Sequence, residues 1–562
     1  MSSYNKVNGR YVNETPHWNK DVLREEFGFD GMTVSDWAAV HDRVAALAGG
    51  TNLTMPADKN NDALLVEAAQ NGTLPESELD AACCDIIALA LKGAALHKPA
   101  AAYDFEKAHT LARRIAAECM VLLKNEDNIL PLDKKCRIAL IGGFAAQPRY
   151  QGAGSSHVNA YKVPALTDIT AGLNNVSFSE GFDMSGVPSA EKQNAAVAAA
   201  QAAEIAVIFA GLPPVMESEG FDRWVMKLPQ DQNELIEKIC AVQPNTVVVL
   251  QNGGPVELPW ADHPKAILEA YLGGEAVSEA IWDVLTGAAA PSGHLAETFP
   301  LRLEDNPSYL SWPGSGNHVP YQEGVFVGYR YYTTRRMAVR YPFGHGLTYT
   351  DFSYSDLTLS TDSFTKGDTL KASVTVTNTG KRTGKALVQL YVGAKLGSIA
   401  ERCPVRELRA FEKIELQPGE SRRVVLTLTD RAFSHWDSGV HSWRVMGGTY
   451  TVEVGTSAQD IVLSAPIRAA DEYIPDGRTY NIMTSLEDAL RHPAGQAFWE
   501  KIQPQLNAAM ARMNAGNQTP MPYGDEMPAS VGLMVEPLQT LKRLLPMISE
   551  AEWNTLFDEM NR

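Results

Sequence analysis

Short apolar runs alternate with longer segments of helical spacing through residues 1–350. Runs rich in β-forming residues and bounded by turn residues predict buried strands, and apolar residues spaced three and four apart predict helices. This alternation is typical of parallel sheets covered by helices. The predicted strands are Met32–Asp36, Thr51–Met55, Arg137–Gly142, Ile205–Ala210, Thr246–Leu250 and Ala266–Tyr271.

The helical segments between these strands complete two α/β regions. Residues 1–104 are too few for a (β/α)8 barrel, which takes about 250 residues, so we expect them to form only its last part. Residues 105–350 have the pattern of a doubly wound or sandwich α/β domain. The predicted helices are Asn19–Phe27, Trp37–Ala48, Asp62–Ala69, Glu76–Leu91, Ala108–Leu123, Ala190–Ala203, Gln232–Val242 and Ala276–Leu285.

The pattern changes after residue 350. Strict alternation of apolar and polar residues with frequent turn signals predicts a fibronectin III-like β-sandwich over residues 351–468. Residues 469–562 form a helical extension with two amphipathic runs, Leu486–Met513 and Leu538–Met560, on either side of the Pro/Met/Gly-rich stretch Thr519–Pro528. We expect this extension to pack on the body of the protein rather than on a second subunit of a homo-oligomer.

The overall charge narrows the classes of partner. A formal charge of −18 and a pI near 5.2 disfavour binding to nucleic acid or to an anionic membrane. The start of the chain has no signal sequence and no segment has the apolar length of a membrane span, so we expect a cytoplasmic protein. The six cysteines and twelve histidines are scattered, which predicts buried free thiols and no metal site.

Asp36 is the first candidate for chemistry, because it ends a predicted strand. Side chains at the carboxyl ends of barrel strands line active sites. A structural role competes with this interpretation, since Asp is a preferred N-cap and Ala38-Ala39-Val40 has helical character.

The loop Gly211–Trp224 is the second candidate, because it must lie beyond the carboxyl end of a buried strand. It holds three acids. The aromatic rings of Phe221 and Trp224 are expected to exclude water from a carboxyl group in the loop and so to raise its pKa. The competing interpretation is a solvated loop with a surface pair between Asp222 and Arg223.

Two carboxylates on different domains suggest glycoside hydrolysis, in which one protonates the leaving oxygen and the other attacks the sugar or activates water. A gap of about 5 to 5.5 Å between them predicts retention of configuration. The glycine-rich segment Gly152–Ser156 also follows a strand, but His157 stands where the dinucleotide motif needs its third glycine. Backbone positioning near a cleft is the favoured role for this segment.

Several motifs follow one another along residues 1–468: Ser3-Tyr4-Asn5-Lys6, Phe27-Gly28-Phe29-Asp30-Gly31, Val34-Ser35-Asp36-Trp37, Val121-Leu122-Leu123-Lys124-Asn125, Glu219-Gly220-Phe221-Asp222-Arg223, Gly328-Tyr329-Arg330-Tyr331-Tyr332 and Pro342-Phe343-Gly344-His345-Gly346-Leu347. Together they resemble glycoside hydrolase family 3, the β-glucosidase family. The resemblance implies the closing part of a catalytic barrel, an α/β sandwich domain and a fibronectin-like third domain, and it covers residues 1–468.

The resemblance also implies roles for single residues. Asp36 matches the nucleophile, Glu219 matches the acid/base, Trp37 would flank the sugar, and Tyr4 matches a tyrosine near the nucleophile. The implied reaction is retaining hydrolysis of terminal β-D-glucosyl residues from small glycosides or oligosaccharides, without a cofactor.

The sequence departs from the family pattern at its start. Family members carry most of the barrel before the segment that matches Ser3-Tyr4-Asn5, so we expect this chain to lack those strands. The alternative function is therefore an inactive remnant, or a carbohydrate-binding or assembly module that needs a separate N-terminal barrel chain.

Overall fold

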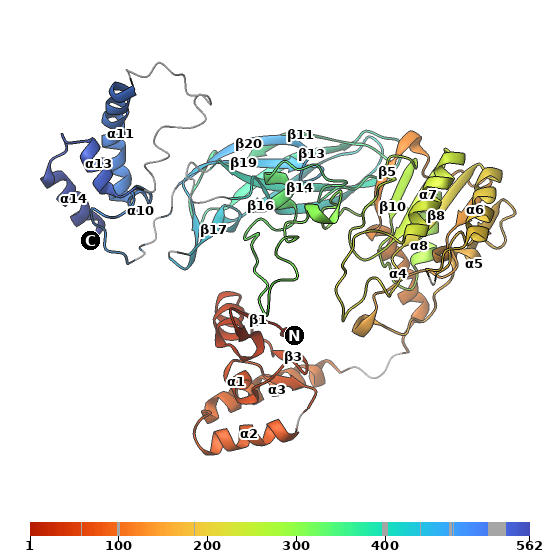
Figure 1. The fold of residues 1–562 in the computed structure, drawn as a ribbon, viewed down its shortest axis with the longest axis horizontal. Helices are drawn as coiled ribbons and strands as arrows, with labels where there is room; N and C mark the ends of the chain where they lie inside the picture. Colours follow the sequence, from red (N-terminus) through yellow and green to blue (C-terminus); the bar gives the residue numbers. More distant parts are fainter. Residues whose placement is uncertain are drawn as a thin grey trace. The chain divides into compact units, whose positions relative to one another are not determined.

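The computed structural model describes residues 1–57, 59–97, 102–184, 186–395, 403–438, 440–470, 472, 475, 477–514 and 536–562. They form two compact units, Met1–Asp104 and Phe105–Arg562 (Figure 1).

Parallel strand pairing organises the first unit. β3 (Val34–Trp37) and β4 (Leu53–Met55) pair in parallel, and Ser2 forms a parallel bridge to Ser35 on the other side of β3. Three parallel segments thus lie side by side, as expected for successive strands of part of a barrel. The described strands of this unit do not close into a barrel. β1 (Lys6–Val7) and β2 (Arg10–Tyr11) form a short antiparallel pair.

The helices of the first unit include a π-helix over His17–Glu26, α1 (Arg43–Ala48), α2 (Lys59–Gln70) and α3 (Glu76–Leu96). The prediction of a helix over Trp37–Ala48 is wrong in its first half. Ala38 has a left-handed φ of 63°, and the chain turns before α1. Asp42 caps α1 by accepting a hydrogen bond from the Ala45 N–H at 2.9 Å, so the alternative role of Asp36 as N-cap is also wrong.

A six-stranded sheet is the centre of the α/β domain. Its strand order is β5-β10-β9-β8-β6-β7, in which only β5 runs antiparallel to its neighbour. All residues of β8 and β9 are buried, as expected for strands covered on both faces. The strands are β5 (Val121–Asn125), β6 (Ile138–Ile141), β7 (Val176–Ser179), β8 (Ile205–Gly211), β9 (Thr246–Gln251) and β10 (Ala266–Glu269).

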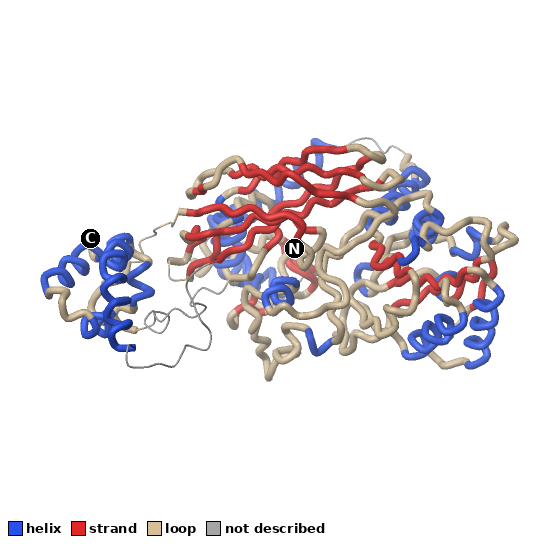
Figure 2. The backbone as a smooth tube through the Cα atoms, turned by 90° about the horizontal axis from the view of Figure 1, so that it is seen from above, coloured by secondary structure: helices blue, strands red, loops and turns tan. Residues whose placement is uncertain are grey.

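Helices of this domain flank the sheet (Figure 2). They are α4 (Phe105–Cys119), α5 (Leu166–Thr170), α6 (Ala190–Ala202), α7 (Gln230–Val242) and α8 (Val277–Thr286). The short helix α9 (Tyr329–Thr334) instead packs against the β-sandwich, where Tyr329 contacts Tyr391. The predicted helix Ala108–Leu123 ends at Cys119 instead, because Val121 starts the edge strand β5.

The third region is a β-sandwich, as predicted. Its two sheets have the orders β11-β13-β16 and β12-β20-β19-β14-β15. Along β13, Leu370, Ala372, Val374 and Val376 point into the core. The strands are β11 (Phe352–Leu359), β12 (Ser363–Phe364), β13 (Leu370–Asn378), β14 (Gly384–Lys395), β15 (Glu407–Leu416), β16 (Ser421–Leu428), β19 (Gly448–Gly455) and β20 (Ile461–Ala469), with a separate pair β17 (Ser434–Asp437) and β18 (Ser442–Val445).

The C-terminal extension has its own core around Trp553, which is 0% exposed. Its described helices are α10 (Leu486–Leu490), α11 (Pro493–Asn514), α13 (Leu538–Leu544) and α14 (Glu550–Met560). Arg491 reaches the body of the protein, with its Nη1 3.4 Å from both carboxylate oxygens of Asp437. The Thr519–Pro528 stretch lies outside the described residues.

The cysteines correct one expectation from the sequence. All six are free, but Cys83, Cys84 and Cys119 are exposed and the other three are only half-buried, so the prediction of buried thiols is wrong. Within the described ranges, no helix has both the length and the apolar character needed to cross a bilayer.

Candidate active site

Asp36 lies at the carboxyl end of β3, where the sequence placed it. Its backbone is fixed by strand pairing, because its N–H donates to the Ser2 carbonyl oxygen at 3.0 Å. The Trp37 N–H donates to Asp36 Oδ1 at 2.7 Å. The second carboxylate oxygen, Oδ2, accepts no hydrogen bond from the described residues, so it is available to an incoming group.

The residues around Asp36 keep this end of β3 open. Trp37 and Tyr4 are 61% and 52% exposed, so both present aromatic surface outside the core of their unit. The left-handed backbone of Ala38 comes directly after the Asp36-Trp37 pair. Such strain in a non-glycine residue is concentrated at functional sites.

Asn13 holds the segment that carries Tyr4, and the sequence analysis missed it. This side chain is 0% exposed, its Nδ2 donates to the Ser3 carbonyl at 2.8 Å, and its Oδ1 accepts from Ser2 Oγ at 2.6 Å. A single asparagine in a polar stretch carries no signal of such a role, since both partners lie ten or more residues away.

Glu219 lies in the loop that follows β8, and the glycine-rich segment Gly152–Ser156 holds it. The Ser155 N–H donates to Glu219 Oε2 at 2.5 Å, and the Glu219 N–H donates to the Ala153 carbonyl at 3.4 Å. Gly154 has a φ of +86°, and a Cβ there would lie 2.6 Å from both Cβ and Oε2 of Glu219. The segment therefore positions an acid. Gly154–Ser156 is a single 3-10 turn, not the start of the α-helix that a dinucleotide motif needs.

A buried ion pair anchors the same loop. Arg149, with a side chain 4% exposed, lies 2.6 Å from Glu217 Oε2 and donates to the carbonyls of Leu212 and Glu217. The Gly253 N–H also donates to Glu217 Oε2, at 2.8 Å. Charge-assisted bonds of this kind fix both ends of the segment before Glu219. Neither Arg149 nor Glu217 was singled out from the sequence.

Phe221 and Trp224 were expected to exclude water from Glu219, and within the unit Phe105–Arg562 this expectation is wrong. The two rings are 50% and 65% exposed, and Glu219 itself is exposed. The alternative of an Asp222–Arg223 surface pair is also wrong. Arg223 faces Glu217 at 3.5 Å and donates to the Pro255 carbonyl at 2.6 Å, and Asp222 has no ion-pair partner among the described residues.

A third acid lies beneath this edge of the sheet. Glu269 ends β10 and is 0% exposed, and burial raises the pKa of its carboxyl well above the usual range. The Tyr271 N–H and Asn252 Nδ2 both donate to it at 3.0 Å. An acid at the end of the apolar strand Ala266–Glu269 is the signal that would have found it.

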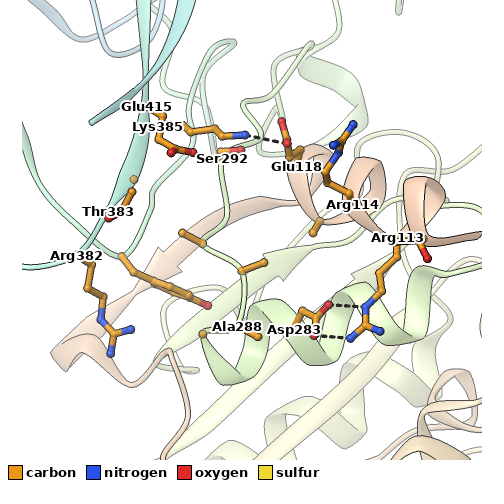
Figure 3. A pocket seen from close by; sticks show the side chains of 17 residues that line it. Arg113, Arg114, Glu118, Asp283, Ala288, Ser292, Arg382, Thr383, Lys385 and Glu415 are labelled. Atoms are coloured by element: carbon orange, nitrogen blue, oxygen red, sulfur yellow. Dashed lines mark hydrogen bonds and ion pairs between the residues drawn. The ribbon is translucent and has the colours of Figure 1, made fainter. Parts of the chain in front are cut away.

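The predicted site residues divide between the two units: Asp36, Tyr4 and Trp37 belong to the first, and Glu219 to the second. A cavity of about 730 Å³ between the α/β domain and the β-sandwich is lined by none of them (Figure 3). Its walls include the ion pairs Arg113–Asp283 and Lys385–Glu118. Among the described residues, no three His, Cys, Asp or Glu side chains are grouped to hold a metal ion.

Three family models match the chain. Residues 1–89 match the glycosyl hydrolase family 3 N-terminal domain, residues 120–349 match the family 3 C-terminal domain, and residues 386–458 match a fibronectin type III-like domain.

Two relatives show how far the similarity extends. The chain is 42% identical over 569 residues to the thermostable β-glucosidase B of Acetivibrio thermocellus, covering 98% of this chain and 74% of the relative. It is 40% identical over 476 residues to an exo-α-(1→6)-L-arabinopyranosidase of Bifidobacterium longum, covering 82% of this chain and 62% of that protein.

Solved structures agree with these matches. The crystal structure of a family 3 β-glucosidase from Bifidobacterium adolescentis is 39% identical, with a TM-score of 0.84 over 88% of this chain and 73% of that one. β-Glucosidase 3B from Thermotoga neapolitana is 31% identical, with a TM-score of 0.75 over 84% of this chain and 70% of that one. The predicted resemblance is confirmed, and the chain belongs to glycoside hydrolase family 3.

Proposed function

We propose that this chain is a retaining β-glucosidase that removes terminal β-D-glucosyl residues from small glycosides or oligosaccharides. Asp36 is the nucleophile and Glu219 the acid/base. The observation that carries the proposal is the position of the two acids, Asp36 at the carboxyl end of β3 and Glu219 in the loop that follows β8, each with its backbone N–H held by a hydrogen bond. The β-glucosidases among its relatives support the same activity.

Each acid can supply one part of a double displacement. The unoccupied Oδ2 of Asp36 attacks the anomeric carbon and forms a glycosyl ester while Glu219 gives its proton to the leaving oxygen. Glu219 then takes a proton from the water that hydrolyses the ester. The Ser155 N–H donates to Oε2 of Glu219 and so orients this side chain.

The test separates the two roles by chemical rescue with azide. Asp36→Ala and Glu219→Ala should each lower turnover of p-nitrophenyl β-D-glucoside by about a thousandfold or more. Azide then replaces the nucleophile in Asp36→Ala and yields the α-glucosyl azide. In Glu219→Ala it attacks the ester and yields the β-glucosyl azide. Asp222→Ala, an exposed acid three residues further along the loop, is the matched control and should keep near wild-type turnover.

Unchanged turnover in either variant, or exchanged azide products, would reject these assignments. Turnover of p-nitrophenyl α-L-arabinopyranoside tests the activity that the name of the Bifidobacterium longum relative gives. We expect this chain to hydrolyse the β-D-glucoside faster than the arabinopyranoside. Binding of glucoside by the wild-type chain with no turnover would favour the alternative, a carbohydrate-binding module completed by a separate barrel chain. The cytoplasmic location stays a prediction from the sequence, and a homo-oligomer stays the less favoured alternative for the C-terminal extension.

A further inference from the structure

The turn after Asp36 is strained, so it needs contacts on both sides of the strained residue. Ala38 has a left-handed φ of 63°, which the Cβ of a non-glycine residue disfavours. Such a conformation persists only where the surrounding structure fixes the chain. On the side before it, the Asp36 N–H donates to the Ser2 carbonyl at 3.0 Å. The Ala38 N–H donates to the Met55 carbonyl at 2.7 Å. The side after Ala38 needs contacts of its own.

Glu14 supplies contacts on the side after Ala38. Its Oε1 accepts hydrogen bonds from the N–H groups of His41 at 2.7 Å and Asp42 at 3.0 Å. Hydrogen bonds to an ionised carboxylate are roughly twice as strong as those between neutral groups. The Glu14 side chain is only 15% exposed, so little water competes for this oxygen. One carboxylate thus holds the end of the turn.

The chain around Glu14 is itself held in place. Its backbone packs against the end of α1, where a Cβ on Gly49 would lie 2.9 Å from the Glu14 carbonyl carbon. The preceding residue, Asn13, donates from Nδ2 to the Ala39 carbonyl at 3.4 Å and to the Ser3 carbonyl at 2.8 Å. The adjacent side chains of Asn13 and Glu14 therefore hold the two segments that lie on either side of the end of β3.

The shape of this turn sets the direction of the Asp36 carboxylate. The Trp37 N–H donates to Asp36 Oδ1 at 2.7 Å, and Trp37 directly precedes the strained residue. If the turn relaxed, the peptide group that carries this N–H would rotate away from Oδ1. We propose that Glu14 is a positioning residue, which holds the turn so that Asp36 presents its Oδ2 to the anomeric carbon. This inference rests on the proposed function, because it takes Asp36 as the nucleophile.

Two conservative substitutions separate the reach of the Glu14 side chain from its charge. Glu14→Asp keeps the charge, but its carboxylate is one methylene group too short to reach both N–H groups. Glu14→Gln loses the charge and keeps an acceptor oxygen at the same reach. If Glu14 acts by hydrogen bonding to the turn, Glu14→Asp should be impaired and Glu14→Gln should not.

Covalent labelling of Asp36 measures the step in which it attacks the sugar. With 2,4-dinitrophenyl 2-deoxy-2-fluoro-β-D-glucoside, Glu14→Asp should lower the labelling rate constant about ten- to a hundredfold, because small misplacements of a reacting group are costly. The binding constant of the reagent should change less than about twofold, and Glu14→Gln should stay within about threefold of the wild type in both constants. Glu25→Asp, at an exposed acid of the same unit, is the matched control and should behave as the wild type.

Three kinetic results would overturn the proposal. The first is an unchanged labelling rate constant in Glu14→Asp. The second is a loss in Glu14→Gln as large as that in Glu14→Asp. The third is a loss confined to binding of the reagent.

Amide hydrogen exchange of the full chain tests the turn without turnover. Glu14→Asp should speed exchange at Trp37, His41 and Asp42, whereas Glu14→Gln and Glu25→Asp should leave it unchanged. Unaltered exchange at Trp37 in Glu14→Asp would refute the role of the turn, and so would faster exchange throughout Met1–Asp104, which would show a general loss of structure. Faster exchange at the turn alone, in a protein whose wild type neither hydrolyses glucosides nor takes the label, would count against the proposed function alone.

Discussion

Gly154 is the residue on which the placement of Glu219 depends most directly. Gly154→Ala should lower kcat at least tenfold, because the new Cβ would meet Cβ and Oε2 of Glu219 at 2.6 Å. The left-handed backbone adds a stability cost of about 1–2 kcal/mol. Steady-state kinetics and urea unfolding measure the two effects separately.

Gly274→Ala is the control for that substitution. Gly274 has a similar φ of +78°, but a Cβ there would meet nothing within 4 Å. It should show the cost in stability without the loss of turnover. Equal kcat values for the two variants would show that close approach at Gly154 does not position the acid.

His294 gives the protein a dependence of stability on pH. Burial lowers its pKa to about 4, and the hydrogen bond with the Ser292 carbonyl only partly opposes this. The unfolded chain, with a histidine pKa of about 6.5, binds the proton first as the pH falls. His294 therefore leaves the free energy of unfolding at its full value above pH 6.5. As the pH falls from 6.5 to 4, this residue lowers the free energy of unfolding by about 3 kcal/mol.

Denaturant unfolding at pH 7, 5.5 and 4 measures this loss. His294→Gln should flatten the pH dependence, and His263→Gln, at an exposed histidine, should leave it as in the wild type. A His294→Gln profile as steep as that of the wild type would assign the loss of stability to other groups.

The loop after β8 is an element without regular structure, and its shape depends on one buried ion pair. Arg149→Met leaves Glu217 without its closest cation, so it should cost about 3–5 kcal/mol. Arg137→Met removes the exposed pair with Glu204, whose side chains are 65% and 48% exposed, and should cost about 1 kcal/mol or less. Urea unfolding compares them, and similar losses would contradict an anchoring role for Arg149.

The strands and helices with strong periodicity could be predicted from the sequence, and the weakest elements could not. Val121–Leu123 continues an apolar helical face as well as it starts a strand, so the pattern does not separate β5 from the end of the preceding helix. β7 gives no clear strand signal, because Val176–Ser179 is short and only half-buried or exposed.

Some residues of the candidate site have a signal in the sequence and others do not. Asp36 and Glu219 follow strands, which is a local signal. Arg149 lies 68 residues from Glu217, and Asn13 bonds to Ser3 from 10 residues away, and no spacing rule connects such partners. Polar anchors of this kind become visible only when the chain is folded.

A small shared core joins the α/β domain to the β-sandwich. Tyr391 of β14 is 0% exposed and meets Tyr329 of α9 edge to face, with ring centroids 6.2 Å apart. The Tyr329 hydroxyl accepts from the Leu408 N–H of β15 at 2.7 Å, and Gln389 Nε2 donates to the Gly344 carbonyl at 2.9 Å. The two domains thus share buried aromatic surface and hydrogen bonds, which predicts that they unfold together.

Tyr391→Ala tests that coupling. Loss of a fully buried aromatic side chain should cost about 3–5 kcal/mol, and because the loss falls on the shared core, the single thermal transition expected for the two domains should split in two. Phe411→Ala is the control, since Phe411 lies on the neighbouring strand opposite Gln389 but is 67% exposed. Scanning calorimetry follows both variants. A single transition in Tyr391→Ala, shifted down without broadening, would mean that contacts outside this core suffice to couple the domains.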